Sequence, residues 1–367
     1  TNFLIELNLS ELIDEGIYSY FEFYGVKRSE TTKITTPKNK RPYSQILKNI
    51  KKKDTHEQGT IEWYQFRWNH ITASSAWKAL EQESTKNQII LDKCKPINIA
   101  KYSRVNITSA MHHGHKFEPL SILIYENLYN TKIGEYGCIE NDDYPHLAAS
   151  PDGINIKLDN PRYGRALEIK NPTTREICGI PKKEYWVQMQ MQMECLNLDD
   201  CDFLETAFKE YKTEDEFLKD GNFNTTKDGK RKGIILCLND GTKPTYEYVP
   251  LTITTYTQYE IWRNETIDFN PHLTWITDTY WYLETISCVL VRRNKLWFNA
   301  IKHKLKEVWD IILKEREDGY EHRRPKKRAK KGPKLAITTP PLKPKIAPNT
   351  ANFKIDTQTL KSVALEI

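Results

Sequence analysis

The sequence contains no run of about eighteen apolar residues, the length that a membrane-spanning helix needs, so we expect no membrane span. Its start has no basic segment followed by an apolar one, which argues against a secretory signal. The seven cysteines are odd in number and show no C-x-x-C spacing. This pattern indicates reduced thiols in an intracellular protein and argues against a structural zinc or iron–sulfur site.

Aromatic residues and basic segments are, by contrast, abundant. Nine Trp, twenty Tyr and twelve Phe indicate a globular body. Residues 27–53 contain 10 Lys and Arg against one acid, and residues 320–367 contain 12 against 3. The body between these two arms is acidic, so we expect any DNA groove there to be a local basic patch. The arms are suited to contacts with phosphates, although the alternative is that they only keep the protein soluble.

Hydropathy and charge divide the chain into four parts. Residues 1–55 are expected to form a helical element and a basic connector, and residues 56–260 the core. Residues 261–319, helical over 272–317, are expected to pack on that core, and residues 320–367 to be a largely disordered basic tail. Helical and strand patterns alternate in the core, which predicts an α/β (α+β) fold with a mixed central sheet flanked by helices.

The expected elements of the core follow from apolar periodicity. Helices are predicted over 62–67, 74–80, 108–130 and 184–198, and strands over 133–139, 146–149, 154–157, 166–170, 202–208, 233–238 and 246–250.

The stretch from Leu147 to Pro172 carries the strongest chemical signal. Asp152 stands in a Ser-Pro-Asp-Gly turn, and a strand sixteen residues later carries Glu168 and Lys170. Side chains alternate along a strand, so Glu168 and Lys170 point to the same face. Two carboxylates and an amine suit a Mg²⁺ or Mn²⁺ site for phosphodiester hydrolysis. The alternatives are an ordinary turn and a solvated ion pair.

Two helical segments add polar side chains to this group. Glu118 lies four residues after Gly114, on the same face of a predicted helix, and is a candidate third carboxylate. On the helix after the strand, Gln188 and Gln192 lie at the rim of the apolar stripe with Tyr185 nearby, while Gln190 points away. The rim glutamines either bond a phosphate or water, or are plain boundary residues.

A third segment suits a terminal phosphate. Arg67 and Ser74 flank a predicted turn, with Ser74 as the N-cap of the following helix. A guanidinium beside a hydroxyl and a helix N-terminus forms an anion pocket. The alternative is a capped helix beside a surface arginine.

In chain order, the motifs W-x-x-x-R-x-x-x-I-T-A-S, G-x-x-x-E, S-P-D-G, L-E-I-K-x-P and Y-x-x-Q-x-Q occupy residues 60–198. This series resembles the lambda exonuclease, or YqaJ-like viral recombinase, family of PD-(D/E)XK nucleases. The resemblance implies a restriction-endonuclease-like core with a helical C-terminal extension. It also implies degradation of one strand of linear double-stranded DNA from the 5′ end, leaving 3′ overhangs for a single-strand annealing or single-stranded DNA-binding partner.

The resemblance also implies roles for the matching residues. Asp152, Glu168 and the backbone carbonyl of Ile169 would hold two Mg²⁺ (or Mn²⁺) ions, with Glu118 assisting at the second. Lys170 would position the water and Gln188 would orient groups near it. The 5′-phosphate and the DNA would be bound by Arg67, Ser74, Gln192 and Tyr185.

Several features depart from the family pattern. The polar loop Lys157–Tyr163 lengthens the gap between the two carboxylates, and the arms and C-terminal region are additions that put the family's trimeric ring in doubt. An endonuclease or nickase with the same metal site is therefore an alternative, and a catalytically inactive recombination scaffold is another. Residues 323–331 resemble a nuclear localisation signal, which points to a host nucleus; otherwise we expect a cytoplasmic site of viral replication. The segment 352–367 is a candidate docking peptide.

Overall fold

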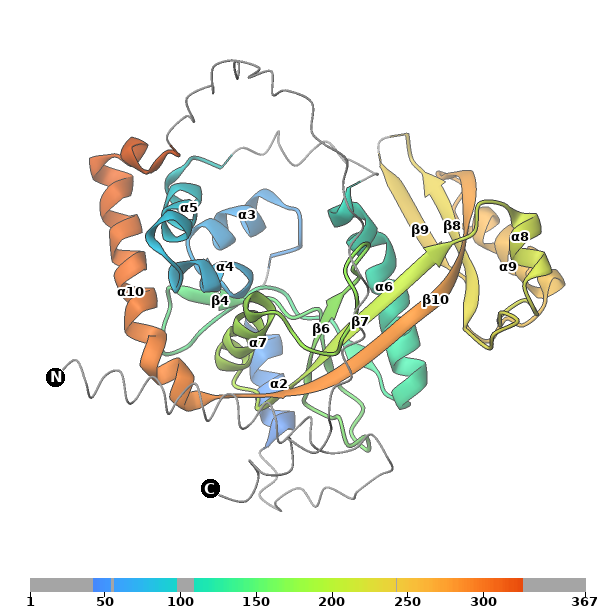
Figure 1. Cartoon of the computed structure of the whole chain (residues 1–367), viewed down its shortest axis with the longest axis horizontal. Coiled ribbons are helices and arrows are strands. Elements are labelled where there is room, and N and C mark those ends of the chain that lie inside the picture. Colours follow the sequence, from blue (N-terminus) through green and yellow to red (C-terminus); the bar gives the residue numbers. More distant parts are fainter. Residues whose placement is uncertain (1–41, 54–55, 98–108, 242, 326–367) are drawn as a thin grey trace, which may run out of the picture. The chain divides into compact units, whose positions relative to one another are not determined.

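The computed structural model describes residues 42–53, 56–97, 109–241 and 243–325 (Figure 1). The helical element expected near the N-terminus, most of the nuclear-signal segment and the docking peptide expected at the C-terminus lie outside these residues. The chain divides into the units Thr1–Arg324 and Pro325–Ile367, and the fold below is that of the first.

The described elements alternate between helix and strand for most of the chain. The helices are α2 (Tyr43–Lys52), α3 (Ile61–Trp68), α4 (Ala73–Ala79), α5 (Glu83–Cys94), α6 (Ala110–Tyr129), α7 (Lys183–Leu196), α8 (Glu214–Lys219), α9 (Tyr256–Phe269) and α10 (Lys295–Asp318), followed by the 3-10 helix η2 (Glu321–Arg323). The strands are β1 (Ile71–Thr72), β2 (Ile133–Gly134), β3 (Ile139–Glu140), β4 (Leu147–Ala149), β5 (Gly153–Asn155), β6 (Ala166–Lys170), β7 (Asp200–Glu210), β8 (Lys232–Asn239), β9 (Pro244–Tyr248) and β10 (Thr274–Arg292).

A seven-stranded mixed sheet with the order β2-β5-β6-β7-β10-β8-β9 forms the centre of the fold. Strands β6 and β7 are parallel, and α7 makes the crossover that a parallel pair requires. The other neighbours in this sheet are antiparallel. A second sheet has the order β1-β4-β3. The predicted α/β fold, a mixed sheet flanked by helices, is thus confirmed.

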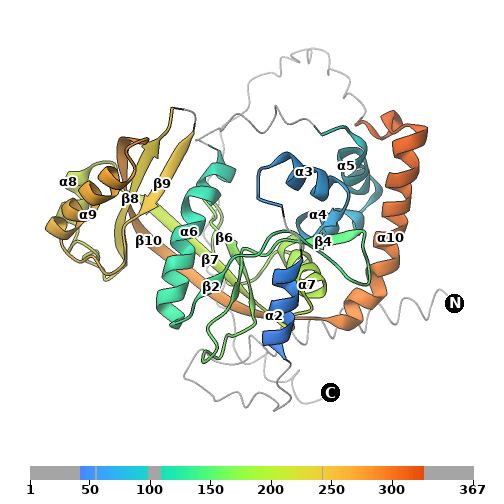
Figure 2. The same ribbon diagram turned by 180° about the vertical axis from the view of Figure 1, so that it is seen from behind.

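Helices α6 and α7 cover opposite faces of the β6–β7 pair (Figures 1 and 2). Leu204 of β7 packs with Tyr125 of α6. The next residue back along the strand, Phe203, packs with Met189 and Met193 of α7. This division follows from the alternation of side chains along a strand. It places Glu168 and Lys170, which share the parity of Ala166, on the α7 face.

The expectation of helix over residues 272–317 is wrong for its first half. Residues Thr274–Arg292 form β10, which pairs with β7 on one side and β8 on the other, and the helix begins only at Lys295 (Figure 1). The segment is rich in Thr, Ile, Val, Trp and Tyr, the residue types that fit a pleated surface. The aromatic residues of this segment are also compatible with the apolar stripe of a helix. The segment forms a strand because its residues favour strands and because two strands, β7 and β8, pair with it. The predicted single strand over 133–139 is likewise two short strands, β2 and β3.

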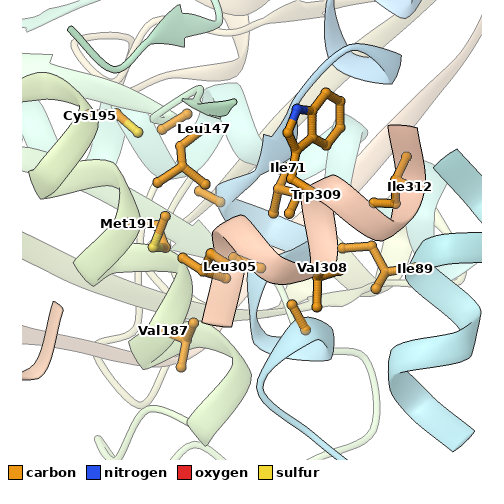
Figure 3. Packing of buried hydrophobic residues seen from close by; sticks show 14 of the residues in the cluster. Ile71, Ile89, Leu147, Val187, Met191, Cys195, Leu305, Val308, Trp309 and Ile312 are labelled. Carbon is orange, nitrogen blue, oxygen red and sulfur yellow. The ribbon is translucent and has the colours of Figure 1, made fainter. Parts of the chain in front are cut away.

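A hydrophobic cluster joins the small sheet to α4, α5, α7 and α10 (Figure 3). Helix α10 contributes Trp309 and Leu305 to this cluster. The other elements contribute Ile71 of β1, Leu147 of β4 and Met191 of α7. Burial of such side chains contributes about 1.5–3 kcal/mol each relative to leaving them in water. The cluster therefore fixes α7, and with it the glutamines of that helix, against β4. None of the helices in the described part of the chain is long and apolar enough to span a membrane.

Candidate active site

The turn between β4 and β5 presents Asp152 to the end of β6. Asp152 Oδ2 accepts a hydrogen bond of 2.6 Å from the backbone N–H of Ile169, and the Asp152 N–H donates to the Leu167 carbonyl at 3.1 Å. Gly153 lies so close to Ile133 that a Cβ atom would overlap the Ile133 side chain. The Ser-Pro-Asp-Gly sequence thus gives a turn that packs tightly and fixes the carboxylate.

Glu168 is the most enclosed carboxylate of the group. Its side chain is 0% exposed, and Oε1 forms an ion pair with Lys170 on the same strand face. Its other oxygen, Oε2, accepts a hydrogen bond of 2.6 Å from Nε2 of Gln192. A buried carboxylate needs such partners, because burial of an unpaired charge is costly.

The carboxylates interact electrostatically. Burial, together with the charges of Glu168 and Glu118, raises the pKa of Asp152 well above its ordinary value. Burial also raises the pKa of Glu118, and Glu168 adds to the rise. For Lys170, burial would lower the pKa, but Glu168 and Asp152 outweigh it and the net shift is upward. Glu118, Asp152, Glu168 and Lys170 therefore form one electrostatic group, and their roles at a metal stay a prediction.

The donor set of this group fits a hard divalent cation, because carboxylate oxygens are the ligands that Mg²⁺ and Mn²⁺ prefer. As the side chains stand, no three His, Cys, Asp or Glu residues in the described ranges are grouped closely enough to hold a metal. Lys170 and Gln192 contact Glu168, and the Ile169 N–H contacts Asp152. A cation would therefore compete with Lys170 for Glu168. The Ile169 carbonyl as a ligand stays a prediction.

Helix α7 contributes a buried glutamine, which differs from the expected rim position. Gln192 is 0% exposed and donates to Glu168 and, at 3.1 Å, to the Ser150 carbonyl. Gln188 is half-buried. Among the described residues, it forms no hydrogen bond to the carboxylates of the group. Gln190 points away, as expected, and donates to the Arg292 carbonyl at 2.8 Å.

Tyr185 lies beside the electrostatic group. The ammonium nitrogen of Lys170 lies 5.1 Å from the centre of its ring, within the range of a cation–π contact. Tyr185, Gln192, Lys170 and Glu168 thus lie in one connected set of side chains.

Arg67 and Ser74 lie on α3 and α4, and among the described residues no hydrogen bond or ion pair joins them to the carboxylates. The Arg67 guanidinium lies 4.5 Å from the Trp63 ring centre, and the Arg67 carbonyl accepts from Lys93. Ser74 is exposed and is not the N-cap: α4 begins after Thr72, because residues 71–72 pair with β4 as strand β1. The hydroxyl expected to cap the helix is therefore free to face solvent.

Sequence reasoning missed Glu205 and Arg175. Glu205 lies inside β7 with a side chain that is 0% exposed, and it forms an ion pair with Arg175 from the segment after β6. An acid within the apolar strand pattern of residues 202–208 is the signal that marks it, because acids are almost never fully buried without a partner.

A comparison with protein families matches the part of the chain that contains the motifs. Residues 62–199 match the family model of the YqaJ-like viral recombinase domain. An uncharacterized protein of Acanthamoeba polyphaga mimivirus is 30% identical over 306 residues, which are 72% of this chain and 54% of that protein. The chain thus spans about half the length of the curated relative it matches.

Two solved exonuclease structures have limited similarity to this chain. The alkaline exonuclease LHK-Exo of Laribacter hongkongensis aligns with a TM-score of 0.42 and 18% identity over 71% of this chain and 95% of that chain. A phage-related exonuclease of Haemophilus somnus 129PT aligns with a TM-score of 0.35 and 12% identity over 68% and 94%.

The matched segment contains every residue that the motifs singled out, from Arg67 to Gln192. It also contains the four members of the electrostatic group around Glu168. The resemblance inferred from the motifs is therefore confirmed: residues 62–199 match the YqaJ-like viral recombinase domain.

Proposed function

We propose that this protein is a metal-dependent deoxyribonuclease that degrades one strand of linear double-stranded DNA from the 5′ end and leaves a 3′ overhang. The observation that carries the proposal is the enclosed carboxylate Glu168, held by Lys170 and Gln192 within electrostatic range of Asp152 and Glu118. The YqaJ-like domain match supports the same chemistry. Burial of repelling acids beside a lysine is costly for a purely structural site.

Two Mg²⁺ ions, with Mn²⁺ as a substitute, are the cofactor that this donor set favours. Asp152, Glu168 and Glu118 would hold them. Bound there, the ions would neutralise charge on the scissile phosphate and lower the pKa of an attacking water.

The remaining roles belong to side chains and backbone groups of the protein. Glu168 and Asp152 raise the pKa of Lys170 against the effect of burial, so its ammonium in the metal-free site is a donor suited to orienting the water or a phosphate oxygen. Gln192 fixes the orientation of the Glu168 carboxylate, and the Ile169 N–H fixes Asp152. These two contacts hold the carboxylates in defined orientations, which is a contribution to preorganisation, and a cation would have to displace Lys170 from Glu168.

Recognition of the DNA end is assigned to α3 and α4. Arg67 and Ser74 would bind the 5′-phosphate, because a guanidinium and an exposed hydroxyl are both donors to phosphate oxygens. Gln188 would orient groups near the water, and Tyr185 would contact the strand being cut.

The test is digestion of linear duplexes labelled at either end, with 5′-phosphate or 5′-hydroxyl, with Mg²⁺ and with EDTA. We expect loss of the 5′-terminal label first, a preference for 5′-phosphate and no digestion in EDTA. Asp152→Ala and Glu168→Ala should abolish cutting and retain DNA binding. Loss of binding in parallel with cutting contradicts the assigned roles.

Circular duplex DNA separates the alternatives. An end-dependent exonuclease leaves it intact, whereas cutting of the circle would identify an endonuclease or nickase. Failure to cut any DNA with Mg²⁺ or Mn²⁺, combined with retained DNA binding, would identify a recombination scaffold.

Partners and localisation extend the proposal. A 3′ overhang is the substrate of a single-strand annealing or single-stranded DNA-binding protein, and a trimer would enclose the DNA. Light scattering of the purified chain tests the trimer. The basic segment 323–331, fused to a fluorescent protein, tests nuclear import against retention in the cytoplasm.

A further inference from the structure

The parallel pairing of β6 and β7 places Glu205 next to Lys170. The two residues are Cα partners in the ladder, and partners in a parallel pair point to the same face of the sheet. Glu205 therefore lies on the face that carries Glu168 and Lys170, one strand further from β5.

Glu205 is buried and forms one side-chain hydrogen bond among the described residues. Its side chain is 0% exposed, and Oε1 accepts from Nη2 of Arg175. The other oxygen, Oε2, is buried and has no hydrogen-bond partner among the described residues. Complete burial of a carboxylate is costly, and a single ion pair offsets little of that cost. Glu205 therefore adds little to the stability of the fold, and we look for another role.

The ion pair brings Arg175 to the same aromatic ring as Lys170. The guanidinium carbon of Arg175 lies 5.7 Å from the centre of the Tyr185 ring, and Lys170 Nζ lies 5.1 Å from it. Arg175 belongs to the irregular segment between β6 and α7, which without an anchor would not hold a side chain in one place. Glu205 supplies that anchor.

Arg175 keeps donors for a second partner. Its guanidinium has five N–H groups, of which Nη2 meets Glu205 and Nη1 makes a long contact of 3.4 Å to the Glu176 carbonyl. The side chain is 22% exposed, so it lies at the surface next to an otherwise enclosed group. A planar guanidinium held by a carboxylate on one edge is suited to a phosphate on the other.

We propose that Arg175 binds a backbone phosphate of the strand being cut, adjacent to the scissile phosphate, and that Glu205 is its positioning residue. This inference rests on the proposed function for the identity of the strand. The contact is independent of base sequence, because it involves only the backbone.

The test is DNA binding by the full chain in EDTA, where cutting does not interfere, over a series of salt concentrations. Arg175→Ala should weaken binding of a linear duplex about tenfold or more and reduce the salt slope by about one, because one phosphate contact is lost. Arg175→Lys should retain the slope and lose part of the affinity. The matched control is Arg231→Ala, which removes an arginine that contacts Asn127 on α6.

The positioning role is tested by a double-mutant cycle. Glu205→Gln should weaken binding in the wild-type background and add nothing in the Arg175→Met background, because Glu205 acts through Arg175. The pair variant Glu205→Gln/Arg175→Met also avoids an unpaired buried carboxylate, and its thermal unfolding shows that the chain is folded. Equal effects of Glu205→Gln in both backgrounds would assign Glu205 to the fold alone.

The outcomes separate this inference from the proposed function. An unchanged salt slope and affinity in folded Arg175→Ala overturns the inference, whether or not the wild type cuts DNA. No measurable binding of the wild type to any duplex overturns it as well. A reduced slope in a protein that cuts nothing supports the phosphate contact and rejects the nuclease.

Discussion

Gln192 donates a hydrogen bond of 2.6 Å to Oε2 of Glu168, and this bond connects the crossover helix α7 to the candidate catalytic strand β6. Both side chains are 0% exposed. Glu168 thus uses Oε1 for the ion pair with Lys170 and Oε2 for the hydrogen bond from α7. Its orientation is therefore determined by two elements that the β6–α7–β7 crossover brings together.

Gln192→Ala should reduce cutting about 10- to 100-fold, the usual cost of removing a partner that orients a metal-binding group. Gln188→Ala, at a position one turn earlier, is the comparison variant. The family resemblance gives Gln188 the role of orienting groups at the site, whereas the observed contact with Glu168 gives that role to Gln192. Initial rates on a 5′-phosphorylated duplex measure both variants. A larger loss from Gln188→Ala would contradict the role given to Gln192.

Asp152 should make the metal-free protein less stable as pH rises. Its pKa is raised in the folded state, so between the unfolded and folded pKa values the folded protein binds more protons, and stability falls with rising pH through that window. Thermal unfolding in EDTA from pH 4 to 8 measures this trend. Asp152→Asn should flatten it, and Mg²⁺ should raise Tm at pH 8 in the wild type only. An identical pH trend in Asp152→Asn would exclude this carboxyl as its source.

The same carboxyls should set the pH dependence of cutting. Asp152 and Glu118 must be ionised to hold a cation, and the pKa of each is raised. Activity should therefore increase from acid to mildly alkaline pH, with a midpoint above the usual carboxyl range. A rate profile at Mg²⁺ concentrations well below saturation measures it, because saturating metal would itself draw the carboxyls into the ionised form. A midpoint near pH 4 under these conditions would argue against the two raised carboxyls as metal ligands.

Arg67→Ala should remove the preference for 5′-phosphorylated ends. A charge-assisted hydrogen bond contributes about 1.5–3 kcal/mol, so the ratio of rates on 5′-phosphate and 5′-hydroxyl duplexes should fall about 10-fold or more. Ser74→Ala should have a smaller effect in the same direction, because a hydroxyl is uncharged. A wild type that degrades both duplexes alike would refute the phosphate pocket.

Gly114 tests whether DNA approaches the first turns of α6. A Cβ atom there would meet nothing within 4 Å, so Gly114→Ala should stabilise the helix by about 1 kcal/mol. If a phosphate packs at this position, the same variant should weaken DNA binding while Tm rises. Unchanged binding with a raised Tm would show that the glycine is not required by the substrate.

Gly233 tests the place of β10 in the sheet. A Cβ atom at Gly233 would lie 2.8 Å from Cζ2 of Trp281, its partner in the β8–β10 ladder. Gly233→Val should therefore cost about 1–3 kcal/mol by overpacking, measured by denaturant unfolding. A neutral effect would be incompatible with Trp281 lying over Gly233.

Local sequence patterns were sufficient to predict the residues of the candidate site. The Ser-Pro-Asp-Gly turn and the Glu-Ile-Lys strand were readable from sequence because turn residues and the alternation along a strand depend only on neighbours in the chain. The four-residue spacing between Gly114 and Glu118, which places both on one face of a helix, also depends only on neighbours in the chain.

Tertiary structure decided which side chains meet. Residues 274–292 became a strand because β7 and β8 both pair with it, and the sequence of the segment does not contain its partners. The contact of Gln192 with Glu168 and the ion pair of Glu205 with Arg175 likewise join residues 24 and 30 positions apart. Propensity and periodicity describe a segment and its faces, whereas these contacts depend on the register of β6 against β7 and on the packing of α7 over them, which only the folded chain fixes.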